Sequence, residues 1–131
     1  MSSGSFYKTL ADEALICGRC GSCRYDCPVY KEIGWESAAP RGKISLTREI
    51  FARGRTELLT DEYAKRITQC TMCGACTQNC AARIELNRFW QELREKLAKQ
   101  GMVPKGYGAL VENLKSKKNI TNFDNATRLD W

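Results

Sequence analysis

The sequence predicts an all-α fold, built from helices that lead into and away from two cysteine-rich loops. Two copies of one cysteine pattern are separated by residues 28–69, and this stretch has the apolar spacing of two helices. No alternating strand pattern stands out anywhere in the chain. The length of 131 residues fits a single domain, 1–131, with a helical core over 6–105 and a tail over 106–131.

Both copies have the spacing C-x2-C-x2-C-x3-C, which is the run that holds bacterial iron–sulfur clusters. They lie 53 positions apart, and Gly21 and Gly74 coincide, so they form an internal repeat. A loop coiled around a cluster needs left-handed backbone, which we expect at Gly18, Gly21 and Gly74. All eight cysteines of the chain fall in the two runs.

In runs of this kind the fourth cysteine ligates the other cluster, so the pattern predicts two [4Fe-4S] clusters with crossed ligands. The expected ligands of the first cluster are Cys17, Cys20, Cys23 and Cys80. The expected ligands of the second cluster are Cys70, Cys73, Cys76 and Cys27. The crossing would tie the two runs into one domain.

Other uses of the cysteines fit less well. Structural zinc also favours C-x2-C pairs, but a third cysteine three positions further on is not a zinc-ribbon pattern. A disulfide framework needs an oxidising compartment, and the start Met1–Ser5 has no signal peptide, so we expect a cytoplasmic protein. A thiol-redox pair would leave six cysteines unexplained.

Charge and hydropathy exclude two classes of partner. The formal charge is +6, and two clusters of about 2− each would reduce it to about +2. The basic residues are scattered, without an aromatic-interleaved basic run, so nucleic-acid binding is not expected. No run of about 18 apolar residues exists, so direct membrane insertion is not expected either.

The first elements lead into and away from the first run. Phe6, Leu10 and Ala14 recur every four residues, which predicts an amphipathic helix over Phe6–Ile16. After Pro28, the Pro and Gly residues predict an irregular stretch. Four apolar residues of this stretch are expected to cover a cluster: Val29, Tyr30, Ile33 and Trp35.

Two helices are predicted before the second run. The first covers Gly42–Arg53, with Gly54 as its stop. Thr60 offers an N-cap for the second, which should deliver the chain to Cys70. Its apolar residues recur every four positions: Leu59, Tyr63 and Ile67.

After the second run the helical pattern is strongest, and it predicts a helix over Ile84–Gln100 that ends at Gly101. The apolar face comprises Leu86, Phe89, Trp90, Leu93 and Leu97. We expect Trp90 to be a core residue rather than an electron relay.

The tail holds one short amphipathic piece. Its apolar face comprises Tyr107, Leu110, Val111 and Leu114. Trp131 has little chain of its own to bury it, which indicates a partner surface or a longer protein.

The cysteine runs, the Pro40–Lys43 segment and the helix after the second run resemble one family over roughly residues 10–105. This family is the two-cluster ferredoxin domain found in heterodisulfide reductases and in glycolate oxidase iron–sulfur subunits. The resemblance implies an α-helical ferredoxin with two cluster-binding loops and a helical C-terminal extension. The second run departs from the family in ending Cys80-Ala81 rather than Cys-Pro.

The resemblance also implies a function. We expect a non-catalytic electron-transfer subunit that relays electrons between a flavin-type donor and a cysteine-rich, heterodisulfide-reductase-like partner. A freely diffusing ferredoxin and a purely structural iron–sulfur module are the alternatives. No histidine, phosphate-binding loop or nucleophile motif suggests catalysis. Four arginines flank the ligands and could stabilise reduced clusters or dock a partner: Arg19, Arg24, Arg41 and Arg83.

Overall fold

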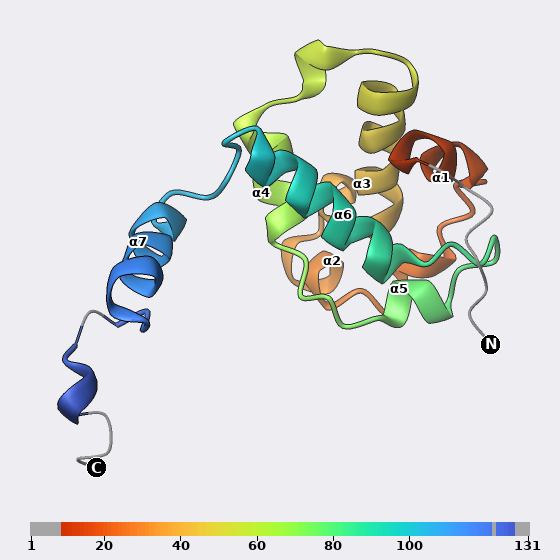
Figure 1. Cartoon of the computed structure of the whole chain (residues 1–131). Coiled ribbons are helices and arrows are strands. Elements are labelled where there is room, and N and C mark those ends of the chain that lie inside the picture. The colour runs from red at the N-terminus through yellow and green to blue at the C-terminus, as the bar shows by residue number, and fades with distance from the viewer. Residues whose placement is uncertain (1–8, 122, 128–131) are drawn as a thin grey trace, which may run out of the picture.

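The structure, a computed structural model, describes residues 9–121 and 123–127. Within these ranges it contains seven α-helices and no β-strand, which confirms the predicted all-α class (Figure 1). The helices are α1 (Leu10–Ile16), α2 (Pro28–Ile33), α3 (Pro40–Thr47), α4 (Asp61–Thr68), α5 (Ala75–Gln78), α6 (Leu86–Lys99) and α7 (Tyr107–Lys117).

Helix α6 organises the core and packs against α1, α4 and α5 (Figure 1). Its predicted apolar face is buried, since Phe89, Trp90, Leu93 and Leu97 are each at most 1% exposed. The rings of Phe89 and Trp90 meet edge to face, with their centroids 5.0 Å apart. Fully burying a large apolar side chain contributes about 1.5–3 kcal/mol, so this face is a main source of stability.

Threonine hydroxyls cap two helices. The hydroxyl of Thr60 accepts a hydrogen bond from the backbone N–H of Tyr63 at 3.2 Å, which confirms the predicted N-cap of α4. Thr9 caps α1 in the same way by accepting from the N–H of Asp12. The first three residues of the helix predicted over Phe6–Ile16 lie outside the described residues.

The irregular stretch predicted after Pro28 is wrong in its first part, because Pro28–Ile33 form α2. Proline is favoured at the first helical position, where its fixed φ fits and its missing N–H is not needed. The prediction that Trp35 covers a cluster is also wrong, because its side chain is 70% exposed. Val29 lies at one of the two cysteine-lined cavities described below.

The helix predicted over Gly42–Arg53 begins two residues earlier and changes geometry before it ends. Helix α3 starts at Pro40, and Arg48–Ala52 continue it as a π-helical turn. Gly54 follows with φ 71°, which confirms the predicted stop.

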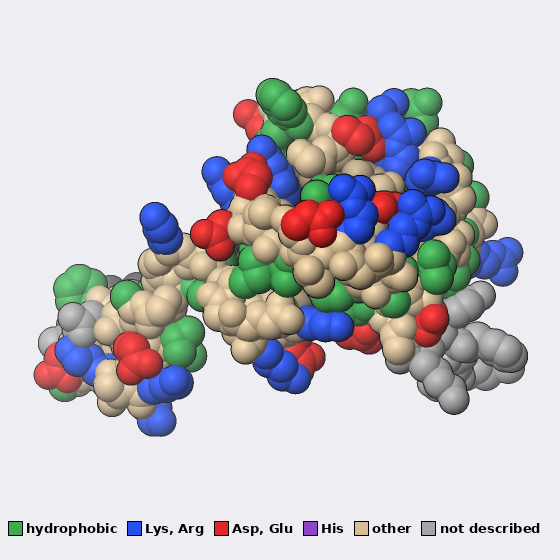
Figure 2. All heavy atoms as spheres, turned by 90° about the horizontal axis from the view of Figure 1, so that it is seen from above, with side chains coloured by type: hydrophobic (Ala, Val, Ile, Leu, Met, Phe, Trp, Pro, Cys, Tyr) green, Lys and Arg blue, Asp and Glu red, His purple; other side chains and the backbone are tan. Residues whose placement is uncertain are grey.

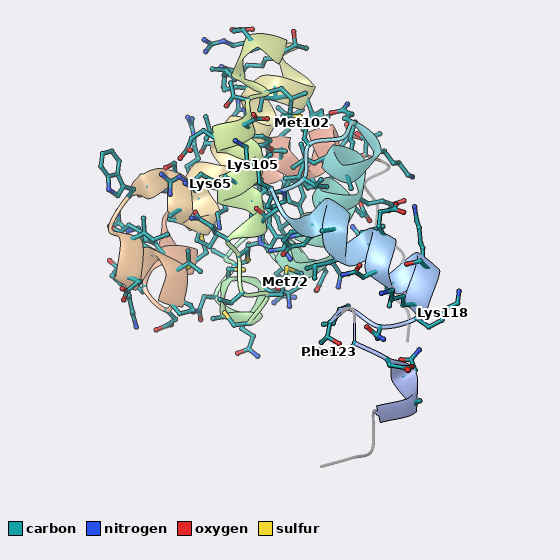
Figure 3. The ribbon with its side chains drawn as sticks, turned by 90° about the vertical axis from the view of Figure 1, so that its left-hand side faces the viewer. Lys65, Met72, Met102, Lys105, Lys118 and Phe123 are labelled. Atoms are coloured by element: carbon teal, nitrogen blue, oxygen red, sulfur yellow. The ribbon has the colours of Figure 1, made fainter. Side chains whose placement is uncertain are left out.

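Helix α7 projects away from the body formed by the other helices (Figure 1). It confirms the amphipathic piece predicted in the tail, but its apolar face is not covered: Tyr107, Leu110, Val111 and Leu114 are 43–53% exposed. Figure 3 shows Phe123 on the segment that follows Lys118 at the end of α7, and this residue is 75% exposed. The prediction for Trp131 lies outside the described residues.

Charges are mixed on the surface that can be inspected. Figure 2 shows Lys and Arg side chains interspersed with Asp and Glu over one face of the body. Several of them form ion pairs, such as Arg66 with Glu62 at 2.7 Å and Lys99 with Glu95 at 2.6 Å. None of the helices in the described ranges is both long and apolar enough to cross a membrane.

Candidate functional site

Two cavities divide the eight cysteines into two sets of four. The first cavity is lined by Cys17, Cys20, Cys23 and Cys80. The second cavity is lined by Cys27, Cys70, Cys73 and Cys76. Each cavity therefore takes three cysteines from one run and the fourth from the other, and this grouping is the one expected from the sequence. The bonds from these cysteines to iron stay a prediction.

The two cysteine loops have the same backbone. Arg19 and Met72 lie 53 positions apart and both have positive φ, at 56° and 59°. Gly21 and Gly74 match in the same way, at 89° and 85°, as predicted. Gly18 is not among the left-handed residues, so that part of the prediction is wrong. Each loop also takes left-handed backbone at a non-glycine residue, Arg19 or Met72, which composition alone does not indicate.

The N-terminus of α3 lies between the two cavities. Pro40 lines both, Arg41 lines the first, and Lys43 lines the second. The N-terminus of a helix carries partial positive charge and stabilises anions nearby. The Pro40–Lys43 segment therefore brings positive charge to both cysteine sets, which explains chemically why such a segment accompanies the runs.

Arg41 is held in an ion-pair network beside the first cavity. Its Nε donates to a carboxylate oxygen of Glu36 at 2.6 Å, and Arg24 donates to the other oxygen at 3.3 Å. The hydrogen bond from Arg41 holds the pKa of the Glu36 carboxyl below its usual range, with Arg24 adding to the effect. Arg19 also lines the first cavity, whereas Arg83 lines neither.

Lys43 is a site residue that the sequence interpretation missed. Its side chain is 1% exposed, and no hydrogen bond or ion pair joins its ammonium to another described residue. Burial lowers its pKa, while the nearby thiols of Cys70, Cys27 and Cys76 act in the opposite direction. The mixture of charged and apolar residues in α3 does not indicate that this lysine points inward.

Two further polar groups lie at the second cavity, on α6. Trp90 and Asn87 both line it, and the indole Nε1 of Trp90 and the Oδ1 of Asn87 are buried without a hydrogen-bond partner. Burial raises the pKa of the Cys76 thiol, and the indole N–H of Trp90 lies close enough to lower it in part. Trp90 is thus the core residue that was predicted, with its one polar atom directed toward a cysteine.

The thiols around the first cavity differ in their readiness to ionise. Burial raises the pKa of Cys23 to about 11 and also raises that of Cys17. A hydrogen bond with the Ser22 hydroxyl lowers the pKa of the exposed Cys20. Thiolates are the species that bind metals, so cofactor binding here must displace protons.

The cysteine sets fit a cluster better than a single ion. Zinc needs thiolates about 2.3 Å from one centre, hence close together. Four thiols around a cavity, with buried donors and a cation beside them, suit the larger anionic [4Fe-4S] group.

Backbone contacts fix the ends of the second run. One guanidinium nitrogen of Arg94 shares its two N–H groups among the carbonyls of Ile67, Thr68 and Cys70, the last at 2.5 Å. The first two of these carbonyls belong to the last turn of α4, where helical partners run out, and the third follows the helix. At the other end, the N–H of Ile84 donates to the sulfur of Cys80 at 3.3 Å.

Comparisons with known proteins agree with this site. Residues 13–84 match the family model described as 4Fe-4S dicluster domain. A probable glycolate oxidase iron-sulfur subunit of Bacillus subtilis (strain 168) is 36% identical over 85 residues, which are 63% of this chain and 18% of that protein. Lactate utilization protein B of Bacillus thuringiensis (strain Al Hakam) is 30% identical over 107 residues, 80% of this chain and 21% of that protein.

A third relative is the uncharacterized electron transport protein YkgF of Escherichia coli (strain K12). It is 31% identical over 96 residues, which are 71% of this chain and 19% of that protein. No solved structure matches the chain. The chain spans about a fifth of the length of the curated relatives it matches.

The matched region, 13–84, covers just over half of the chain and contains all eight cysteines and most of the lining of both cavities. Two sets of four cysteines supply one thiolate for each iron of two four-iron clusters. The prediction of two [4Fe-4S] clusters is thereby confirmed. The chain belongs to the 4Fe-4S dicluster domain family.

Proposed function

We propose that this chain transfers electrons through two [4Fe-4S] clusters as part of a larger oxidoreductase. The names of the relatives support the class of protein, since they include iron-sulfur subunits and an electron transport protein. The observation that carries the proposal is the position of Pro40, which lines both cavities. Clusters held on either side of one residue are close enough to exchange electrons.

In this proposal Cys17, Cys20, Cys23 and Cys80 ligate the first cluster, and Cys27, Cys70, Cys73 and Cys76 the second. The clusters supply one-electron oxidation and reduction when bound. The chain itself holds the thiolates, excludes water with the apolar face of α6, and directs positive charge and N–H donors at the sulfurs. It makes and breaks no bond of a substrate.

The test is a reductive titration of the full chain purified without oxygen. We expect about eight irons per chain and, with a low-potential donor, two magnetically interacting paramagnetic clusters in the EPR spectrum. Cys20→Ser and Cys73→Ser exchange one exposed cysteine at each cavity and should each alter one cluster. Clusters that stay diamagnetic at very negative potential would favour the purely structural alternative.

We propose further that the chain acts inside a complex rather than as a freely diffusing ferredoxin. Residues 106–131 would contact the partner, because α7 buries none of its residues and exposes an apolar face. A flavoprotein donor and a cysteine-rich acceptor are the expected partners. Eight cysteines that bind clusters instead of forming disulfides are typical of a reducing compartment, which supports the cytoplasm as the location.

Affinity purification without oxygen, followed by mass spectrometry, tests this second proposal. A flavoprotein or cysteine-rich subunit in stoichiometric amount is the expected result. Leu110→Lys should weaken its recovery, whereas Gly108→Ala on the same helix should not, because a Cβ there meets nothing within 4 Å. A chain that elutes alone with its irons would favour the diffusible carrier.

A further inference from the structure

The two cavities differ in how their positive charge is compensated. At the first cavity, Arg41 is paired with Glu36, and its side chain is 29% exposed, so a carboxylate and water both offset its charge. At the second cavity, Lys43 is 1% exposed and has no carboxylate partner among the described residues. An ammonium with so little access to water and no carboxylate partner interacts strongly with any negative charge beside it.

The thiols that line the second cavity together with Lys43 identify what that negative charge is. They are those of Cys27, Cys70, Cys73 and Cys76. Cys27 and Cys76 are the two cysteines of the chain that are buried, at 8% and 6% exposure. An isolated buried ammonium is costly, so its position is best explained by a compensating anion in this cavity.

Trp90 adds a second, independent feature at the same cavity. Its Nε1 is buried and makes no regular hydrogen bond, although the sulfur of Cys76 lies nearby, and the side chain is 1% exposed. A buried N–H donor without an acceptor loses the hydrogen bond that it would make in water. The sulfur atoms of a cluster in the second cavity would provide that acceptor. The first cavity has no comparable buried indole among its lining residues.

We propose that Lys43, assisted by the indole N–H of Trp90, raises the reduction potential of the second cluster above that of the first, so that an entering electron comes to rest on the second cluster. This inference rests on the proposed function. A reduced cluster carries one more negative charge than an oxidised one, and a nearby cation or hydrogen-bond donor stabilises the reduced form more. Both groups are held by packed helices, Lys43 on α3 and Trp90 on α6.

Burial of the second cluster has the opposite effect on its reduction potential from that of Lys43, so the two effects must be compared. Removing a cluster from water disfavours its more charged, reduced form and lowers the potential. The same low-dielectric surroundings also strengthen the attraction to Lys43, which sits at the cavity wall rather than across solvent. Because the cation is itself uncompensated, we expect its effect to exceed that of burial.

The experiment is an EPR-monitored redox titration of the cluster-loaded full chain. Lys43→Met replaces the ammonium with an apolar side chain of similar length. Lys65→Met is the matched control: Lys65 is exposed on α4, and Figure 3 places it apart from Met72 of the second loop. Trp90→Phe keeps an aromatic ring and removes the N–H donor together with part of the buried indole volume. Cys73→Ser marks which signal belongs to the second cluster.

We expect Lys43→Met to lower the midpoint potential of the second cluster and to leave that of the first nearly unchanged. Trp90→Phe should lower the same potential by less, and Lys65→Met should change neither. The inference would be overturned if Lys43→Met and Lys65→Met shifted the midpoint potential of the second cluster equally. It would also be overturned if the first electron rested on the first cluster in the wild type. Should Lys43→Met fail to fold, an unchanged potential in Trp90→Phe overturns it and a lowered one supports it.

The two proposals fail in different ways. Wild-type protein whose clusters cannot be reduced at all contradicts electron transfer itself. Clusters that are reduced in the wild type, but whose potentials do not respond to Lys43→Met or Trp90→Phe, contradict only the assignment of these two residues.

Discussion

The Nδ2 of Asn79 donates a hydrogen bond of 2.8 Å to a carboxylate oxygen of Asp26. The two residues are 53 positions apart and occupy the same place in the two copies of the run, each just before the fourth cysteine. This contact between equivalent positions joins the two copies directly. It lies beside Cys27 and Cys80, the cysteines that each copy contributes to the other cavity.

Replacing this amide with a carboxylate should loosen the junction between the copies. In Asn79→Asp two negative side chains would face each other, and the hydrogen bond would be lost. Because the pair is exposed, we expect a loss of about 1 kcal/mol in the free energy of unfolding, together with faster cluster loss. Gln78→Glu makes the same charge change at the adjacent exposed residue, and equal effects in both variants would contradict a specific role for the pair.

A buried chain of hydroxyls joins α4 to α3. The hydroxyl of Thr47 donates to the carbonyl of Lys43 at 2.8 Å, so the Tyr63 hydroxyl, 2.7 Å away, donates to Thr47 in turn. Tyr63→Phe leaves Thr47 without its donor, and we expect a loss of about 1–2 kcal/mol in chemical denaturation. Tyr107→Phe removes an exposed hydroxyl on α7 and should change little.

The same pair predicts a pH dependence. Burial raises the pKa of Tyr63 well above its usual value, so the folded state keeps the proton that the unfolded state loses near pH 10. The unfolded state then binds fewer protons, and stability falls as the pH rises above about 10. Denaturation at several pH values should show the advantage of wild type over Tyr63→Phe constant below about pH 9 and decreasing above it. An advantage that grows with pH would contradict this assignment.

Arg94 should stabilise the entry to the second cysteine loop. Arg94→Met would leave the carbonyls of Ile67, Thr68 and Cys70 without their shared donor. We expect a loss of about 2 kcal/mol in stability, and faster bleaching of the second cluster than of the first under a chelator. Lys99→Met, on the exposed face of α6, is the control. Equal bleaching of both clusters would show that Arg94 stabilises the fold in general and not this loop.

Most of the fold could be predicted from apolar periodicity and helix caps. The division of the cysteines into two sets of four could be predicted from their spacing. Helix α6 follows its apolar pattern, and Thr60 caps α4 as its residue type indicates. Helix α2 could not be predicted with the same ease, because Pro28 is compatible both with a helix breaker and with a first helical residue. Lys43 and Trp90 could not be assigned to the second cavity, because the direction of a side chain depends on how α3 and α6 pack.

Gly42 gives the sharpest conflict between local preference and packing. Alanine is the better helix former by about 1 kcal/mol, so propensity alone predicts that Gly42→Ala stabilises α3. In the structure, however, a Cβ at this position would lie 2.0 Å from the backbone carbonyl oxygen of Glu36, which cannot move aside as a flexible side chain could. We therefore expect Gly42→Ala to lose at least about 2 kcal/mol in thermal or chemical unfolding.

The control for Gly42→Ala is Gly108→Ala, the same substitution in a helix that projects from the body. A Cβ at Gly108 meets nothing within 4 Å, so only propensity acts and α7 should gain up to about 1 kcal/mol of helix stability. Gly42→Ala should thus lower stability and Gly108→Ala should raise it. The first effect is measured as unfolding of the core, and the second as helix content. A Gly42→Ala protein as stable as wild type would mean that the turn over Glu36–Ala38 does not pack against α3 as closely as the structure places it. The positions of Pro40, Arg41 and Lys43 depend on that packing. The same result would therefore also remove the basis for assigning these residues to the two cavities.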